Sequence, residues 1–220
     1  GPDLVAWYPL DGNGTDLSAN ANHATLYGAI PGPDRHGLPG KALVFDGVDD
    51  YLSAPDHPAL RLPTAVTVSV WLKLTRKTFQ HNALQWNFDH SVVAKGGASP
   101  ASGFSGNFML SVGGPERDYP GNVDFGSASS SVSPPWSLAV GSPVDDETWH
   151  AVVATYNGSS RKIFIDGSER KSEQVSGLMA TGPYPLTIGR GAYKALNGSL
   201  DEVRIYNRAL SGGEIKLLYL

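Results

Sequence analysis

Alternation of apolar and polar residues is the most regular pattern in this chain, and it predicts β-strands. The clearest case is residues 66–74, where valine or leucine occupies every second position and forms one apolar face. The opposite face is small and polar around a single indole, so it either faces solvent or lines a shallow cleft. This second face consists of Thr67, Ser69, Trp71 and Lys73.

Shorter segments with a strand signal recur along the chain, separated by turns rich in Gly, Pro, Asn and Asp. Strands are expected at residues 4–10, 24–27, 41–52 (two strands), 92–96, 107–112, 148–156, 161–167, 186–189 and 197–210. Three stretches lack the pattern and are predicted as loops, at residues 30–40, 113–121 and 126–135.

An Asp-Gly pair occurs at residues 46–47 and again at residues 166–167. Because glycine adopts backbone conformations that tight turns require, each pair predicts a hairpin. The first turn also crowds Asp46, Asp49 and Asp50, and their like charges require a cation or backbone donors nearby.

Composition agrees with many short strands joined by turns. The 220 residues include 26 Gly and 16 Pro, and only 17% are charged. No amphipathic run of helical length precedes the last ten residues, where Ser211 and Glu214 have the spacing of a capping box and predict a short helix. The length suits one domain, which we expect to span residues 3–220.

Charge and cysteine content exclude several classes of function. A net charge of -4 offers no basic surface for nucleic acid or for an acidic membrane. The absence of cysteine rules out disulfides and thiolate zinc sites, and no apolar run is long enough for membrane insertion. Gly1-Pro2 resembles the scar of a cleaved tag, so we expect one module of a larger protein, with neighbouring domains as partners.

Asp201 lies in the predicted strand of residues 197–210, where period-two alternation puts it on the same face as Val203 and Ile205. A buried carboxylate must be paired, hydrogen-bonded or bound to a metal. We therefore expect another segment to supply a partner for Asp201. The turn at residues 45–50 is the leading candidate.

A second group of oxygen-bearing side chains, Asp11, Asn13 and Asp16, follows the first predicted strand. Their spacing suits a calcium loop, although the glycine and glutamate positions of an EF-hand are missing. An Asx-type turn between two strands explains them equally well.

Several motifs resemble the laminin G-like group of the concanavalin A-like jelly rolls, and they occur in the family's order. They include Phe45-Asp-Gly-Val-Asp-Asp-Tyr-Leu52, Ile163-Phe-Ile-Asp-Gly167 and Leu200-Asp-Glu-Val-Arg-Ile-Tyr-Asn-Arg-Ala-Leu-Ser211. The resemblance implies an all-β fold: a jelly-roll sandwich of two antiparallel sheets with a short C-terminal helix. Proteins of this fold include lectins, adhesion modules and glycoside hydrolases.

The resemblance also implies a structural calcium ion that joins the end of the first strand, the following hairpin and the penultimate strand. On the matching positions its ligands would be the Asp201 carboxylate, the Gly47 carbonyl and an oxygen near Asp11, with Asp46 as an additional ligand. The alternative is that Asp201 accepts hydrogen bonds from backbone amides of residues 45–48, which would also lower its pKa.

Catalytic patterns are missing from the sequence. Hydrolases of this fold commonly carry a Glu-x-Asp-x-(x)-Glu run on one strand, but the glutamates here are scattered. The zinc-protease, nucleophile-elbow and P-loop motifs are also absent. We therefore expect this domain not to be an enzyme, and a glycoside hydrolase is the less favoured reading.

Sugar-binding surfaces combine aromatic rings, which stack on pyranose C–H faces, with polar side chains that orient hydroxyls. Two insertions, residues 75–91 and 113–145, and the loop near residue 193 hold such side chains outside the family's core pattern. The predicted ligand-binding residues are Asn82, Trp86, Arg117, Asp118, Tyr119, Trp136 and Tyr193, with Tyr184 and Arg190 as further aromatic and polar candidates.

The sequence thus predicts a carbohydrate-binding, lectin-like module that recognises a polysaccharide or glycan. We expect it to be secreted or displayed on the cell surface, attached to an exported bacterial enzyme or surface protein. The alternative is a protein–protein adhesion or spacer domain without a sugar site. Neighbouring sequence would separate these readings, because a hydrolase neighbour favours the glycan module and repeated copies favour adhesion.

Overall fold

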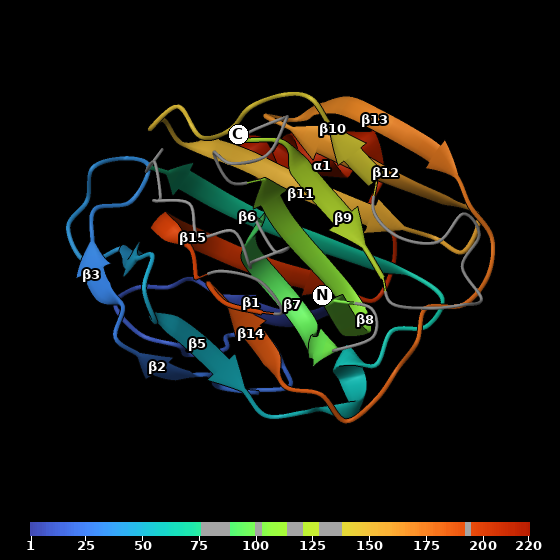
Figure 1. Ribbon diagram of the computed structural model, residues 1–220, viewed down its shortest axis with the longest axis horizontal. Coiled ribbons are helices and arrows are strands. Elements are labelled where there is room, and N and C mark those ends of the chain that lie inside the picture. Colours follow the sequence, from blue (N-terminus) through green and yellow to red (C-terminus); the bar gives the residue numbers. More distant parts are fainter. Residues whose placement is uncertain (76–88, 100–102, 114–120, 128–137, 192–194) are drawn as a thin grey trace.

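The computed structural model describes residues 1–75, 89–99, 103–113, 121–127, 138–191 and 195–220. It consists of two antiparallel sheets packed face to face, with one short helix near the C-terminus (Figure 1). The predicted all-β jelly-roll sandwich is therefore confirmed. Within the described residues no helix is long and apolar enough to cross a membrane.

One sheet has eight strands, in the order β13-β12-β11-β6-β15-β4-β3, with β1 also paired to β15. Its strands are β1 (Leu4–Tyr8), β3 (Ile30–Gly32), β4 (Ala42–Asp46), β6 (Val66–Leu74), β11 (His150–Tyr156), β12 (Ser160–Ile165), β13 (Ser168–Gln174) and β15 (Asn197–Tyr206).

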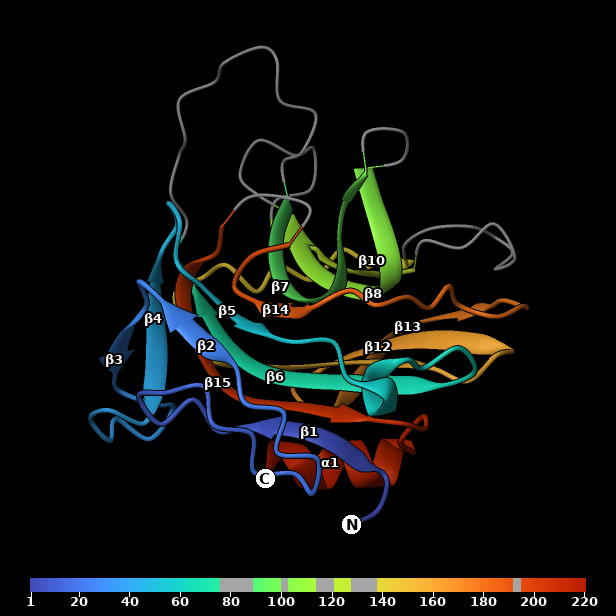
Figure 2. The ribbon, with the colours of Figure 1, turned by 90° about the horizontal axis from the view of Figure 1, so that it is seen from below.

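The other sheet has seven strands, in the order β10-β9-β8-β7-β14-β5-β2. Its strands are β2 (Thr25–Tyr27), β5 (Tyr51–Ala54), β7 (Asp89–Ser99), β8 (Gly103–Gly113), β9 (Val123–Gly126), β10 (Leu138–Val140) and β14 (Leu186–Ile188). A 3-10 turn, η1 (Pro58–Leu60), follows β5, and α1 (Gly212–Tyr219) follows β15. Figure 2 shows α1 on the side of the eight-stranded sheet that faces away from the seven-stranded one.

The alternation predicted for residues 66–74 is confirmed, because every second residue of β6 is buried in the core between the sheets. The other face of β6 is covered by the C-terminal segment. Trp71 stacks on Tyr219 of α1, with 5.7 Å between ring centroids. The Thr67 hydroxyl donates a hydrogen bond to the carbonyl of Arg208 at 2.7 Å. The C-terminal segment thus covers part of this face, which neither of the two predicted alternatives, solvent or a shallow cleft, describes.

The helix begins as predicted. Ser211 is its N-cap, the Ser211 hydroxyl accepts a hydrogen bond from the Glu214 backbone amide, and the Glu214 carboxylate accepts one from the Ser211 amide. Ile215 is buried against Val153 and Phe164 of the eight-stranded sheet. The capping box therefore starts the helix where one apolar side chain can reach the sheet.

The hairpin predicted at residues 46–47 is wrong, because β4 and β5 belong to different sheets. β4 pairs with β15 and β3, whereas β5 pairs with β14 and β2. Gly47 does adopt a left-handed conformation, with φ of 79°, but the turn carries the chain across the sandwich. The hairpin predicted at residues 166–167 is confirmed, and it joins β12 to β13.

Several strands were not predicted from the sequence, namely β3, β9, β10 and β13. β13 is almost entirely exposed and polar, so it has no hydrophobic pattern to detect. β3 lies at a sheet edge and contains Pro31, a residue that weakens a strand prediction. β7 and β8 are longer than predicted and pair from Asp89 and Gly113 to Ser99 and Gly103.

The face assignment within β15 is also wrong, because the strand contains a bulge. Leu200 lies opposite Leu72 on the core face, so its neighbour Asp201 lies opposite Trp71 on the outer face. The register shifts between Asp201 and Arg204, and Glu202 has φ of 55°. This extra residue returns the strand to register, so that Val203 faces the core.

Gly198 of β15 provides a test of how closely the strands approach one another. It has φ of 147°, and a Cβ there would lie 2.3 Å from the Lys73 carbonyl oxygen, which belongs to rigid backbone. Gly198→Ala is expected to lower the free energy of unfolding by about 2–3 kcal/mol in urea titrations. The control is Gly213→Ala, where a Cβ meets nothing within 4 Å, so little change or slight stabilisation is expected. Equal effects of the two changes would contradict this account.

Candidate functional site

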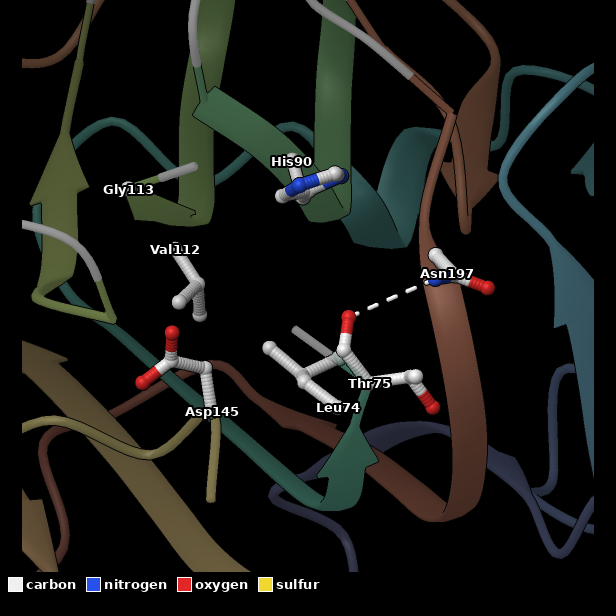
Figure 3. A pocket seen from close by; sticks show the side chains of 7 residues that line it. All are labelled: Leu74, Thr75, His90, Val112, Gly113, Asp145 and Asn197. Carbon is white, nitrogen blue, oxygen red and sulfur yellow. Dashed lines mark hydrogen bonds between the residues drawn. The ribbon is translucent and has the colours of Figure 1, made fainter. Parts of the chain in front are cut away.

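A small pocket lies at one end of the sandwich, at the points where the two predicted insertions begin and end (Figure 3). Thr75 and His90 lie at the two ends of the first insertion, and Gly113 and Asp145 bound the second. The lining is completed by Leu74, Val112 and Asn197. The residues that bound the two segments therefore lie together, although the second segment is not wholly an insertion, because it contains β9 and β10 of the seven-stranded sheet.

Both sheets contribute to this pocket. Thr75 directly follows β6 and Asn197 begins β15, both in the eight-stranded sheet. His90 lies in β7 and Gly113 ends β8, both in the seven-stranded sheet. The pocket has room for roughly one water molecule, so it is too small for a sugar ring. We call its seven lining residues the floor.

Three buried polar side chains line the pocket: His90, Asp145 and Asn197. The His90 Nδ1 atom lies 3.0 Å from the carbonyl oxygen of Ala195. Since a carbonyl only accepts hydrogen bonds, Nδ1 carries the proton of this ring. The Asn197 amide donates to the carbonyl of Thr75 at 3.3 Å, which ties β15 to the end of β6. The floor thus offers an imidazole, a carboxylate and an amide.

All seven predicted ligand-binding residues lie outside the described residues. These are Asn82, Trp86, Arg117, Asp118, Tyr119, Trp136 and Tyr193. Of the two further candidates, Arg190 is described, and its guanidinium lies over the ring of Tyr51, 5.3 Å from the centroid. The backbone carbonyl of Tyr184 accepts a hydrogen bond from the buried Lys95.

The family model described as the concanavalin A-like lectin/glucanases superfamily matches residues 46–216, which is more than half of the chain. The chain belongs to the concanavalin A-like lectin/glucanase superfamily. This confirms the resemblance found in the sequence. No curated protein matches the sequence.

Solved structures of the same fold include domain 4 of AbnA, a GH43 extracellular arabinanase from Geobacillus stearothermophilus, in complex with arabinotriose. It is 20% identical with a TM-score of 0.72, over 99% of this chain and 98% of that one. The binding domain of Paraclostridial Mosquitocidal Protein 1 is 16% identical with a TM-score of 0.70, over 99% of this chain and 52% of that one.

The ligand-binding domain of botulinum neurotoxin serotype D, in complex with N-acetylneuraminic acid, is 15% identical with a TM-score of 0.65, over 99% of this chain and 50% of that one. The present chain therefore spans about half the length of these two toxin domains. At such low identity, the likeness establishes the shared fold.

Membership of the superfamily raises the question of the predicted calcium ion, and the surroundings of Asp201 bear on it. Asp201 is 2% exposed, and its carboxylate forms an ion pair with Arg35 at 2.7 Å. The Arg35 guanidinium also lies over Trp71, 4.9 Å from the ring centroid. The partner of Asp201 thus comes from the loop after β3, and the expectation that residues 45–50 supply it is corrected.

The other predicted calcium ligands also have partners in the protein. Asp11 is exposed and pairs with Lys41 at 2.7 Å. Asp46 accepts a hydrogen bond from the Val48 amide at 2.8 Å, while Asp50, rather than Asp201, accepts one from the backbone amide of Asp46 at 2.9 Å. The backbone hydrogen bond that the alternative assigns to Asp201 is therefore accepted by Asp50 instead.

Asp11, Asp46 and Asp201 do not gather into one group in the described part of the chain. The acidic group found there is Asp46, Asp49 and Asp50, whose ligand atoms lie within 4.8 Å of one another. Asp201 and Asp11 each form an ion pair with a cationic side chain. The predicted calcium ligands Asp201, Gly47, Asp11 and Asp46 therefore do not fit a calcium ion as the structure arranges them.

The turn after β1 has the hydrogen bonds of an Asx-type turn. The Asn13 side-chain oxygen accepts from the Thr15 amide at 2.8 Å. Asp16 is buried, and its carboxylate accepts hydrogen bonds from the backbone amides of Trp7, Ser18 and Asn22. Of the two alternatives for this segment, the structure supports the turn.

The Arg35–Asp201 pair predicts a pH-dependent stability. Burial raises the pKa of Asp201 to about 7, and Arg35 opposes the rise. A carboxyl whose folded pKa exceeds its unfolded value of about 4 contributes stability below pH 4 that is lost as pH rises through 7. Arg35→Met leaves a buried carboxylate unpaired, so we expect a loss of about 3 kcal/mol at pH 8 and a much smaller loss at pH 5.

Urea titrations at the two pH values measure this difference. Lys41→Met is the matched control, because its pair with Asp11 is about half exposed, and less than about 1 kcal/mol is expected at either pH. Equal losses for Arg35→Met at pH 5 and pH 8 would show that the charge of Asp201 is not what Arg35 stabilises.

The same geometry predicts that calcium does not stabilise the fold through Asp201. A ligand bound only to the folded state raises the melting temperature, and EDTA would reverse the rise. We expect Asp201→Asn to leave any difference between the melting temperatures in millimolar calcium and in EDTA unchanged to within about 1 °C. A calcium-dependent rise that Asp201→Asn removes would restore the predicted site.

Proposed function

We propose that this domain is a non-catalytic carbohydrate-binding module whose glycan ligand binds at the pocket where the ends of the two predicted insertions meet. The observation that carries the proposal is the pocket there, since residues at the ends of both insertions line it together. A ligand site needs a few convergent polar groups on a rigid frame. His90 on β7, Asn197 on β15 and Asp145 in the loop between β10 and β11 are the buried polar groups that support the proposal.

The solved structures support this proposal. One is described with arabinotriose and another with N-acetylneuraminic acid, and both share the fold of this chain. They differ in the sugar, so they favour glycan binding in general without naming a ligand. The extracellular arabinanase also supports an exported parent protein in which this module accompanies other domains.

A non-catalytic role agrees with the pocket. Glycoside hydrolysis by a carboxylate pair requires two acids roughly 5–9.5 Å apart across the sugar. Among the seven lining residues, Asp145 is the only carboxylate, and the pocket leaves space for a water molecule rather than a sugar ring.

Affinity gel electrophoresis with a panel of polysaccharides tests the proposal. We expect at least one polysaccharide to retard the domain, and His90→Ala or Asp145→Asn to weaken binding by about tenfold, because either change alters a buried polar group of the floor. His36→Ala is the matched control, since His36 is exposed in the loop after β3 and should leave binding unchanged.

Circular dichroism and melting temperatures verify that the variants fold. If no polysaccharide retards the wild-type domain, the proposal fails in favour of the adhesion or spacer alternative. If the floor variants bind as the wild type does, the ligand site lies elsewhere on the domain.

A further inference from the structure

Three side chains form a stacked row on the outer face of the seven-stranded sheet: Arg190, Tyr51 and Tyr27. The two tyrosine rings are nearly parallel, with 4.5 Å between centroids and 13° between planes. The Arg190 guanidinium lies 5.3 Å from the centre of the Tyr51 ring. The row follows the order of the elements that carry it, because β5 lies between β14 and β2.

Strand register explains the row. Tyr27 lies directly opposite Tyr51, and Leu26 lies opposite Leu52. Leu52 is fully buried and Leu26 packs against the core, so alternation turns both tyrosines to the outer face. Gly189, with φ of 82°, follows β14 and precedes Arg190.

One face of the row is open. Tyr27 is 45% exposed on β2, the last strand on this side of the sheet within the described residues. Within the described residues Tyr51 is the aromatic ring that stacks on Tyr27, and Arg190 lies on the far side of Tyr51. Trp71 on the other sheet differs, since both Tyr219 and Arg35 lie against its ring.

Hydroxyl groups lie beside this row. Thr25 and Ser53 are paired across β2 and β5, and Thr187 of β14 is paired with Ser53. On β2 and on β5 the residue that carries the hydroxyl lies two positions from the tyrosine. These side chains therefore share the outer face, about 7 Å apart along each strand. An aromatic face, a guanidinium and hydroxyls together match the C–H faces and hydroxyl groups of a sugar.

We propose that the Tyr27–Tyr51–Arg190 row is a stacking subsite for a neutral glycan, and this inference rests on the proposed function. The Tyr27 ring stacks on a sugar face, Tyr51 fixes its orientation, and Arg190 donates hydrogen bonds to sugar hydroxyls. One connection joins the row to the pocket, because Arg190 follows β14 and Ala195, which contacts His90, precedes β15.

Charge favours an uncharged ligand. Asp49 and Asp50 directly precede Tyr51, and Asp46 belongs to the same acidic group. Three carboxylates against the single charge of Arg190 leave this edge negative, and the chain as a whole carries -4. Acidic polysaccharides are repelled from such an edge, whereas neutral ones are not.

The test uses the whole domain in affinity gels that contain arabinan, xylan or mixed-linkage β-glucan as neutral probes, and polygalacturonate as an acidic probe. Tyr27→Ala is expected to weaken binding to the retarding neutral polysaccharide by about tenfold, since it removes the exposed ring. Tyr27→Phe keeps the ring and should stay within about twofold of wild type. Arg190→Gln should weaken binding by about threefold.

Tyr219→Ala is the matched control, because Tyr219 is an exposed tyrosine of α1 that also stacks on an aromatic ring, that of Trp71 in the eight-stranded sheet. It should leave binding unchanged. Tyr27 lies on an edge strand, so the variants are expected to fold, and circular dichroism verifies this before binding is measured.

The outcomes separate this inference from the proposed function. If the wild type and Tyr27→Ala bind a neutral polysaccharide equally while His90→Ala weakens binding, the inference fails and the proposed function stands. If no polysaccharide retards the wild type, both fail. If polygalacturonate alone retards it, the proposed function stands and the neutral subsite is overturned.

Discussion

The bulge in β15 is the feature on which the rest of the eight-stranded sheet depends. β15 pairs with β6 along one side, and on the other side it pairs first with β4 and then with β1. The extra residue near Glu202 lies where the partner changes. It keeps Val203 and Ile205 in the core but turns Asp201 outward, and the carboxylate is then stabilised by Arg35. A local irregularity of one strand thus fixes the position of the loop after β3.

Elements specified by local signals could be predicted from the sequence. β6 follows its strict alternation, and α1 begins at a cap that the spacing of Ser211 and Glu214 encodes. The bulge could not be predicted, because it depends on the two partners that β15 meets in succession. For the same reason the Asp-Gly pair at residues 46–47 predicts a hairpin that does not form, because such a pair indicates a turn but not the sheet that the next strand joins.

The candidate site, too, could be predicted from the sequence only in part. Sequence reasoning identified the two insertions, and the structure places their ends around one floor. It missed the tyrosine row, because β2 and β5 are three and four residues long and their pairing joins positions 24 residues apart. The available signal was the repeated Leu-Tyr alternation, as Tyr27 follows Leu26 and Tyr51 precedes Leu52. Only the register shows that these alternations share a face.

The central place of β15 also has a consequence for the order of folding. β15 comes late in the chain, yet it lies between β6 on one side and β4 and β1 on the other. During synthesis β1, β4 and β6 therefore emerge before the strand that joins them. Strands that are so far apart in the sequence pair slowly, and until they do, their unpaired edges can pair with other chains. This domain is thus most prone to aggregate at the stage of folding before β15 has paired with these strands.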